Sequence, residues 1–242
     1  MRRTAVIGKK KLSRYNTDIA ALSETPFPEN SPLEEHRSGY TFFWSDRLAH
    51  EPRQSGVDFA IRNHRLKLLD KLPKTINERL ATMTMKGNSH VTFISAYAPT
   101  MAYSDKAKEE FYEQLHHAIQ SVSHTDNLFL LGDFKARVRS DHTTLYKVLG
   151  HHGIRKENSN GTLLLTLCAG RQLVITNAQF TENYSFKTTW RQPRSGHWHQ
   201  IYFVIIRQKD LPCSSDMLFW KAKCPSLSNW KGSTSECNEP KS

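Results

Sequence analysis

The stretch Asn127-Leu128-Phe129-Leu130-Leu131-Gly132-Asp133-Phe134 decides how the rest of the sequence is interpreted. Leu128 to Leu131 form an unbroken apolar run, which is typical of a strand that is buried on both faces of a sheet. In an open α/β sheet, ligands bind beyond the carboxyl ends of the strands, so Asp133 would lie where chemistry usually takes place. The alternative is a simple turn, in which an aspartate after a glycine has no further role.

Two earlier apolar runs also end in a polar side chain. The run over residues 18–25 ends at Glu24 and is followed by the breakers Pro26 and Pro28. The run over residues 90–97 ends at Tyr97, which taken singly is as well explained as a core tyrosine at the edge of a sheet. Two buried strands now end in an acidic residue, one at Glu24 and one at Asp133. Two such strands favour a functional edge of the sheet more strongly than one.

A helix is predicted between the second and third of these strands. Ser104 can cap it, Asp105 suits the dipole of its first turn, and an apolar stripe at helical spacing continues to Val122. The strand–helix–strand order implies parallel pairing of residues 91–97 with residues 127–131.

The other segments predict a mixed α/β fold. Further strands are expected over residues 39–44, 56–61, 80–85 and 173–177, a helix over 162–169 with Gly170 as its C′ residue, and a β-hairpin from residues 188–190 and 198–206. His197 and His199 alternate on one face of that hairpin and could bind a metal, but no third ligand is nearby, so a zinc site is disfavoured.

Composition indicates an ordinary globular chain with basic character. The formal net charge is +11 in 242 residues, with a pI of about 9.6, which favours polyanions such as nucleic acid as partners. No apolar stretch is long enough for a membrane span, and no apolar segment follows Met1-Arg2-Arg3 as in a secretory signal. The four cysteines lack metal-site spacing and are interpreted as reduced thiols of an intracellular protein.

The two ends of the sequence differ from its centre. Basic residues cluster within residues 1–14, either as a nucleic-acid or nuclear-localisation patch or, as we prefer, as a solvated helix face. From Gln208 onward glycine, serine and proline punctuate the chain, so we expect a domain over residues 1–207 and a loosely ordered tail over 208–242.

Several motifs, in one order, resemble a known family. These are residues 20–25 (AALSET), 95–99 (SAYAP), 131–134 (LGDF) and 198–204 (WHQIYFV), supported by 39–45 (GYTFFWS), 189–195 (TWRQPRS) and Asn160-Gly161. Together they resemble the endonuclease/exonuclease/phosphatase superfamily. Within it they resemble the apurinic/apyrimidinic-endonuclease-like domain of RTE-type non-LTR retrotransposons.

The resemblance implies a fold and a chemistry. The fold is a four-layer sandwich of two mixed β-sheets flanked by helices, and the chemistry is Mg²⁺-dependent hydrolysis of a DNA phosphodiester. In the family pattern Glu24 would hold the metal, Tyr97 would contact the scissile phosphate or assist the leaving group, and Asp133 would orient or deprotonate the attacking water.

Other positions depart from the family pattern. Lys135 replaces an asparagine, and an ammonium that reaches Asp133 would compete with a metal or water for the carboxylate. Tyr202 replaces an aspartate and cannot supply a negative charge at neutral pH. The family's closing Asp-His pair and its first strand have no counterpart, so the resemblance implies a fold truncated at the N-terminal strand and degenerate at the C-terminus.

The sequence therefore leaves three functions open. We expect a retrotransposon-derived endonuclease-like domain that is catalytically impaired, because losing a general base or its orienting partner costs on the order of 10² to 10⁴ in rate. An active Mg²⁺ nuclease would use Glu24 and Asp133 with a substitute base. A non-catalytic nucleic-acid-binding protein would use its basic residues, namely Lys135, Arg137, Arg139, Arg191 and Arg194. For each of these we expect an intracellular, plausibly nuclear, monomer that binds DNA and no membrane.

Overall fold

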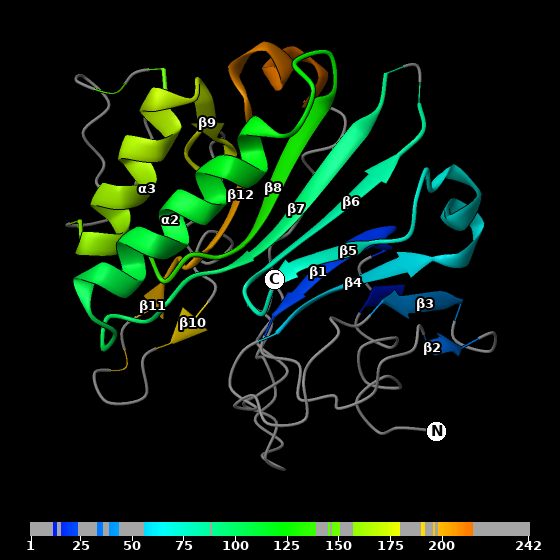
Figure 1. Cartoon of the computed structure of the whole chain (residues 1–242), viewed down its shortest axis with the longest axis horizontal. Helices are drawn as coiled ribbons and strands as arrows, with labels where there is room; N and C mark the ends of the chain where they lie inside the picture. Colours follow the sequence, from blue (N-terminus) through cyan, green and yellow to red (C-terminus); the bar gives the residue numbers. More distant parts are fainter. Residues whose placement is uncertain are drawn as a thin grey trace, which may run out of the picture.

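The computed structural model describes residues 12–13, 16–23, 33–35, 39–43, 56–87, 89–138, 145, 147–150, 157–179, 190–191, 196 and 198–214. Two β-sheets pack face to face, and two α-helices cover the outer face of the larger sheet (Figure 1). The larger sheet contains, in spatial order, β5 (Lys74–Asn77), β6 (Leu80–Met85), β7 (Val91–Tyr97), β8 (Asn127–Asp133), β12 (Tyr202–Arg207) and β9 (Leu173–Ile175). The smaller sheet contains β1 (Ile19–Ser23), β4 (Val57–Arg62), β3 (Tyr40–Phe43) and β2 (Leu33–Glu35).

The predicted strand–helix–strand unit is confirmed. Helix α2 (Asp105–Gln120) connects β7 to β8, and these two strands pair in parallel from Val91 opposite Asn127 to Tyr97 opposite Asp133. The hydroxyl of Ser104 accepts a hydrogen bond from the amide of Ala107 and so caps the helix. The remaining pairs of the larger sheet are antiparallel, so that sheet is mixed, whereas every pair in the smaller sheet is antiparallel.

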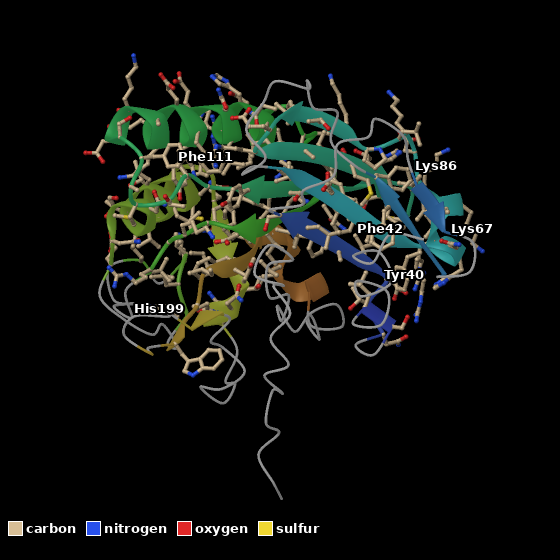
Figure 2. The ribbon with its side chains drawn as sticks, turned by 90° about the horizontal axis from the view of Figure 1, so that it is seen from below. Tyr40, Phe42, Lys67, Lys86, Phe111 and His199 are labelled. Carbon is tan, nitrogen blue, oxygen red and sulfur yellow. The ribbon has the colours of Figure 1, made fainter. Side chains whose placement is uncertain are left out.

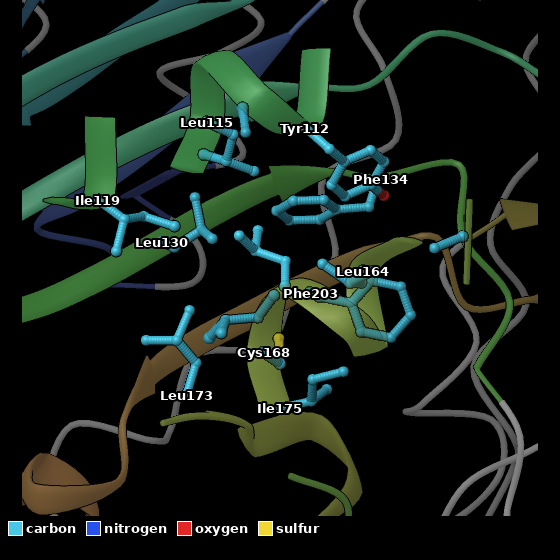
Figure 3. Packing of buried hydrophobic residues seen from close by; sticks show 14 of the residues in the cluster. Tyr112, Leu115, Ile119, Leu130, Phe134, Leu164, Cys168, Leu173, Ile175 and Phe203 are labelled. Atoms are coloured by element: carbon cyan, nitrogen blue, oxygen red, sulfur yellow. The ribbon is translucent and has the colours of Figure 1, made fainter. Parts of the chain in front are cut away.

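One hydrophobic core lies between the larger sheet and its two helices (Figure 3). Helix α2 contributes Leu115 and Ile119, and α3 (Ser159–Gly170) contributes Leu164 and Cys168. They pack against alternate residues of the strands, of which Figure 3 labels Leu130, Leu173, Ile175 and Phe203. This core fixes α2 and α3 over the sheet and thereby fixes the loops that lead into them.

A second core lies between the two sheets. Phe129 and Leu131 of β8 face this core, while Leu128 and Leu130 face the helices, as the period of two along a strand requires. The rings of Phe93 and Phe129 stack there with centroids 5.4 Å apart. Burial on both faces explains why the strand that anchors the sequence pattern is apolar without alternation.

The fourth layer of the expected sandwich is small in the described part of the chain. Leu12 is buried against the outer face of the smaller sheet, together with Leu22, Tyr40 and Phe42. Of the helices in the described ranges, none has both the length and the apolar composition needed to cross a membrane.

Helix α3 differs from its predicted bounds. It begins earlier, at Ser159, because the side chain of Asn158 accepts a hydrogen bond from the amide of Gly161 and caps the helix. It also ends differently, because the residue in the left-handed conformation is Gln172, with φ 52°, and Gly170 is still helical. The prediction that Gly170 is the C′ residue is therefore wrong.

The last third of the fold is more broken than the sequence indicates. The strand predicted over residues 173–177 ends at Ile175, and a 3₁₀ turn, η2 (Thr176–Ala178), follows because the Thr176 hydroxyl donates to the carbonyl of Val204. The predicted hairpin forms, but its second strand is divided. Its first part, β11 (Trp198–His199), pairs with β10 (Trp190–Arg191), and β12 then joins the larger sheet.

Candidate functional site

Asp133, the last residue of β8, lies between two tyrosines at the carboxyl edge of the larger sheet. Tyr97 ends β7 and is in parallel register with Asp133, and Tyr202 begins β12 and is in antiparallel register with it. Residues in register project from the same face, which here is the face that the smaller sheet covers. The Asp133 side chain is fully buried. The sheet thus brings together three of the side chains that the sequence analysis selected.

Lys135 holds the Asp133 carboxylate. Its ammonium nitrogen Nζ lies 2.6 Å from Oδ2, and its backbone amide donates to Oδ1 at 3.1 Å. The sequence predicts that Lys135 reaches Asp133 from an extended backbone. The backbone of Lys135 is instead left-handed, with φ 47°. The chain curls directly after Asp133, which lets a single residue contact both carboxylate oxygens.

Arg79 is a further residue at this site, and no sequence pattern indicated it. It lies in the turn between β5 and β6, where its Nη1 donates to the carbonyl of Tyr97 at 3.3 Å. Its guanidinium carbon is 5.4 Å from the centroid of the Tyr97 ring, and Lys135 Nζ is 5.2 Å from the same centroid. Two cations therefore contact the aromatic ring that lies beside Asp133.

The loops that follow β7 and β8 are tied together by Asn160. Its side-chain Nδ2 donates to the carbonyl of Pro99 at 2.8 Å and to that of Phe134 at 3.3 Å. The hydroxyl of Tyr112 on α2 donates in turn to the Asn160 carbonyl. The start of α3 thus fixes the two segments that carry Tyr97 and Asp133. The motif Asn160-Gly161 signalled this position only through the family resemblance.

Comparisons with known proteins identify the fold. No family model matches the chain. It is 28% identical over 204 residues to craniofacial development protein 2 from Bos taurus and 27% identical over 204 residues to the same protein from Tragulus javanicus. These matches cover 83% of this chain but only 33% and 34% of the relatives, so the chain spans about a third of their length.

Solved structures agree with this assignment. The endonuclease domain of TRAS1, a telomere-specific non-LTR retrotransposon, has a TM-score of 0.57 at 14% identity, over 87% of this chain and 83% of that one. The 3′ phosphatase NExo from Neisseria, bound to product DNA hairpin, has a TM-score of 0.59 at 15% identity, over 85% and 82%. Humanised D. rerio TDP2 has a TM-score of 0.54 at 12% identity, over 84% and 75%. The chain has the endonuclease/exonuclease/phosphatase fold.

The remaining sequence-predicted residues are only partly described. Arg137 is exposed two residues beyond Lys135, and its amide donates to the side chain of Asn158 at 2.8 Å. Arg191 lies on β10. Other predicted site residues lie outside the described part of the chain, namely Glu24, Arg139, Arg194 and His197. Their predicted roles stay predictions.

The family resemblance implies a bound Mg²⁺ at this site. Mg²⁺ prefers carboxylate oxygens, but both oxygens of Asp133 are engaged by Lys135. Across the described ranges, no group of three or more His, Cys, Asp and Glu side chains is close enough to hold a metal. The described residues therefore do not by themselves fit a magnesium site, and binding through Asp133 would first require Lys135 to move away.

Proposed function

We propose that this chain is a retrotransposon-derived, endonuclease-like domain in which hydrolysis of DNA phosphodiesters is impaired. The contact between Lys135 and Asp133 carries the proposal, because it occupies the carboxylate that the family resemblance assigns to the attacking water. The fold shared with the TRAS1 endonuclease domain supports the retrotransposon origin.

The physical effect of Lys135 is twofold. An ammonium group 2.6 Å from Oδ2 favours the ionised carboxylate, so Asp133 accepts a proton from water less readily. The same positive charge repels a divalent cation at that carboxylate. Tyr202 adds a neutral phenol opposite Asp133, where the resemblance implies an aspartate.

Nicking of supercoiled plasmid and of a duplex with one abasic site tests this function. With Mg²⁺, the wild-type chain is expected to cleave at the rate of a buffer control. Lys135→Asn releases Asp133 and is expected to raise the rate, and the double variant Lys135→Asn with Tyr202→Asp is expected to raise it further. Lys67→Asn, a lysine substitution on the turn between β4 and β5, serves as the matched control.

Wild-type cleavage that requires Mg²⁺ and disappears in Glu24→Ala would contradict impairment. It would instead support the active nuclease, with Glu24 holding Mg²⁺ and Asp133 acting on the attacking water. A Lys135→Asn chain that remains folded by circular dichroism and still does not cleave would show that Lys135 is not the limiting defect.

A second candidate function is nucleic-acid binding without cleavage. Arg79 and Lys135 both contact the ring of Tyr97, and Arg137 is exposed two residues beyond Lys135. The chain carries a formal net charge of +11. The structural neighbours NExo and TDP2 were solved with DNA. Binding of labelled DNA that weakens steeply as salt rises, with no cleavage, would support this function. Nuclear location of a monomeric, fluorescently tagged chain would be consistent with either candidate.

A further inference from the structure

The loop that leads from β7 into α2 presents an exposed aromatic side chain beside the candidate site. Tyr103 is 44% exposed and Met101 is 48% exposed, although the loop itself is well fixed. The amide of Tyr103 donates to the carbonyl of Thr100 at 3.1 Å, and the sulfur of Met101 accepts from the side chain of Asn158 at 3.3 Å. An exposed ring in a fixed position is pre-organised to receive a flat ligand at low entropic cost.

Arg79 joins this exposed ring to the site. Its guanidinium carbon is 5.1 Å from the centroid of the Tyr103 ring and 5.4 Å from that of Tyr97. The arginine is held by both rings and by the carbonyl of Tyr97, so its side chain is only 14% exposed. The carboxylate of Glu78, which is itself 46% exposed, lies 3.7 Å from Nε, and Nη1 donates to Tyr97, so the Nη2 donors of Arg79 remain for a ligand.

We propose that Tyr103 and Arg79 bind one unpaired nucleotide of a single-stranded nucleic acid, with the base stacked on Tyr103 and its phosphate held by Arg79. A planar aromatic side chain next to a guanidinium matches the alternation of base and phosphate along a single strand. A duplex keeps its internal bases stacked on one another, so only its two terminal pairs have a free base face. The proposal depends on the nucleic-acid binding proposed above, and it names the form of nucleic acid and the residues that bind it.

Fluorescence anisotropy with a labelled oligodeoxythymidylate and with a labelled duplex of equal length, both in EDTA, tests the proposal. Stacking on an aromatic residue is worth about 1–3 kcal/mol per base, so Tyr103→Ala is expected to weaken single-strand binding roughly 5- to 150-fold. Tyr103→Phe keeps the ring and is expected to bind as the wild type does. Duplex binding is expected to change less than about twofold in Tyr103→Ala.

Arg79 is tested through the salt dependence. Arg79→Gln is expected to lower the slope of log K against log salt by about 0.7 for the single strand, because one phosphate contact is lost. Lys67→Gln removes the same charge on the turn between β4 and β5, at the end of the molecule opposite the start of α2, and is expected to leave the slope unchanged (Figures 1 and 2).

The failure of this inference can be distinguished from the failure of the proposed function. If the wild-type chain binds single strands and Tyr103→Ala binds them equally well, the nucleotide site is refuted while nucleic-acid binding remains. If the wild-type chain binds neither oligonucleotide, both are refuted. Equal weakening of single-strand and duplex binding in Tyr103→Ala would also refute the preference for unpaired bases.

Discussion

Gly132 is the residue at which β8 comes closest to β7. A Cβ atom at this position would lie 2.0 Å from the carbonyl oxygen of Ala96. Neither strand can move away easily, because β6 and β12 pair with their other edges. The glycine therefore lets the strand that carries Asp133 lie against the strand that carries Tyr97.

Substituting Gly132 by alanine is expected to lower the free energy of unfolding by about 1–3 kcal/mol through overpacking. Gly170→Ala is the matched control, because a Cβ at Gly170 meets nothing within 4 Å and the residue is helical. That substitution is expected to be neutral or to stabilise by up to about 1 kcal/mol. Urea titrations of both variants provide the measurement, and equal stabilities would show that the β7–β8 spacing adapts freely.

The thiol of Cys168 is expected to be unreactive in the folded chain. It is fully buried in the core beneath α3, and burial raises the pKa of the thiol above its ordinary value, because a thiolate there would lack solvation. In a background with Cys213, Cys224 and Cys237 changed to serine, iodoacetamide at pH about 8.5 should modify Cys168 only as fast as the chain unfolds.

The same pKa shift has a consequence for stability. In the folded chain the Cys168 thiol keeps its proton, whereas in the unfolded chain the thiol releases it above about pH 8.5. The contribution of the protonated thiol to folding stability is therefore lost as pH rises above about 8.5.

Rapid alkylation of Cys168 in buffer without urea would show that α3 does not seal the core.

Single residues at the site were harder to predict than the strands that carry them. Asp133 and Tyr97 could be placed because each ends an apolar run, and the β-α-β order brings the two strand ends together. The backbone of Lys135 could not be predicted, because a left-handed lysine leaves no trace in residue periodicity. Arg79 could not be predicted either, since only the antiparallel pairing of β6 with β7 brings it beside Tyr97.

At the scale of elements, Arg207 connects the end of β12 to the end of helix α2. The side chain is buried and donates to the carbonyls of Val122, Ser123 and Asp126, at 2.9, 2.6 and 2.9 Å. These carbonyls follow the helix, so one planar guanidinium satisfies acceptors in the turn between α2 and β8. This contact orients the helix relative to the strand that leads to Asp133.

Arg207→Lys is expected to lower the free energy of unfolding by about 1–3 kcal/mol, although the charge is kept. An ammonium cannot reproduce the fork of donors that reaches all three carbonyls. Arg207→Gln is the comparison, because it removes the charge as well. Thermal and urea unfolding measure both variants, and a lysine variant as stable as the wild type would show that charge alone matters.

The order of elements could be predicted well, and the interruptions could not. Apolar runs and the capped helix determined β1, β3, β4, β6, β7, β8 and α2, because hydrophobic period and capping chemistry are local. The break between β11 and β12 depends on a distant partner, since the amide of Phe134 donates to the carbonyl of Ile201. The early start of α3 was obscured because Asn158, Ser159 and Asn160 together resemble a loop.

At the scale of the molecule, the described structure continues past residue 207, where composition suggests the end of the domain. Residues Gln208 to Ser214 form the 3₁₀ segment η3, and the amide of Gln208 donates to the carbonyl of Gln172 at 2.8 Å. Asp210 is buried and accepts a hydrogen bond from the amide of Leu128 at 3.2 Å. A segment expected to belong to a loose tail therefore closes the start of the central strand.

A chain that ends at Ser214 is expected to be as stable as one that ends at Ser242. A chain that ends at Arg207 leaves the Leu128 amide without Asp210, and it should lose about 1–3 kcal/mol of unfolding free energy. Urea unfolding of the three chains gives the comparison. An equally stable chain ending at Arg207 would restore the boundary predicted from composition.

The position of β12 between β8 and β9 has a consequence for synthesis on the ribosome. Residues 202–207 emerge long after residues 127–133, by roughly 4–15 s at ordinary elongation rates. During that interval β8 has a bare apolar edge, and β9 has no partner in the sheet. A nascent chain of this protein therefore stays vulnerable to aggregation until β12 has left the exit tunnel.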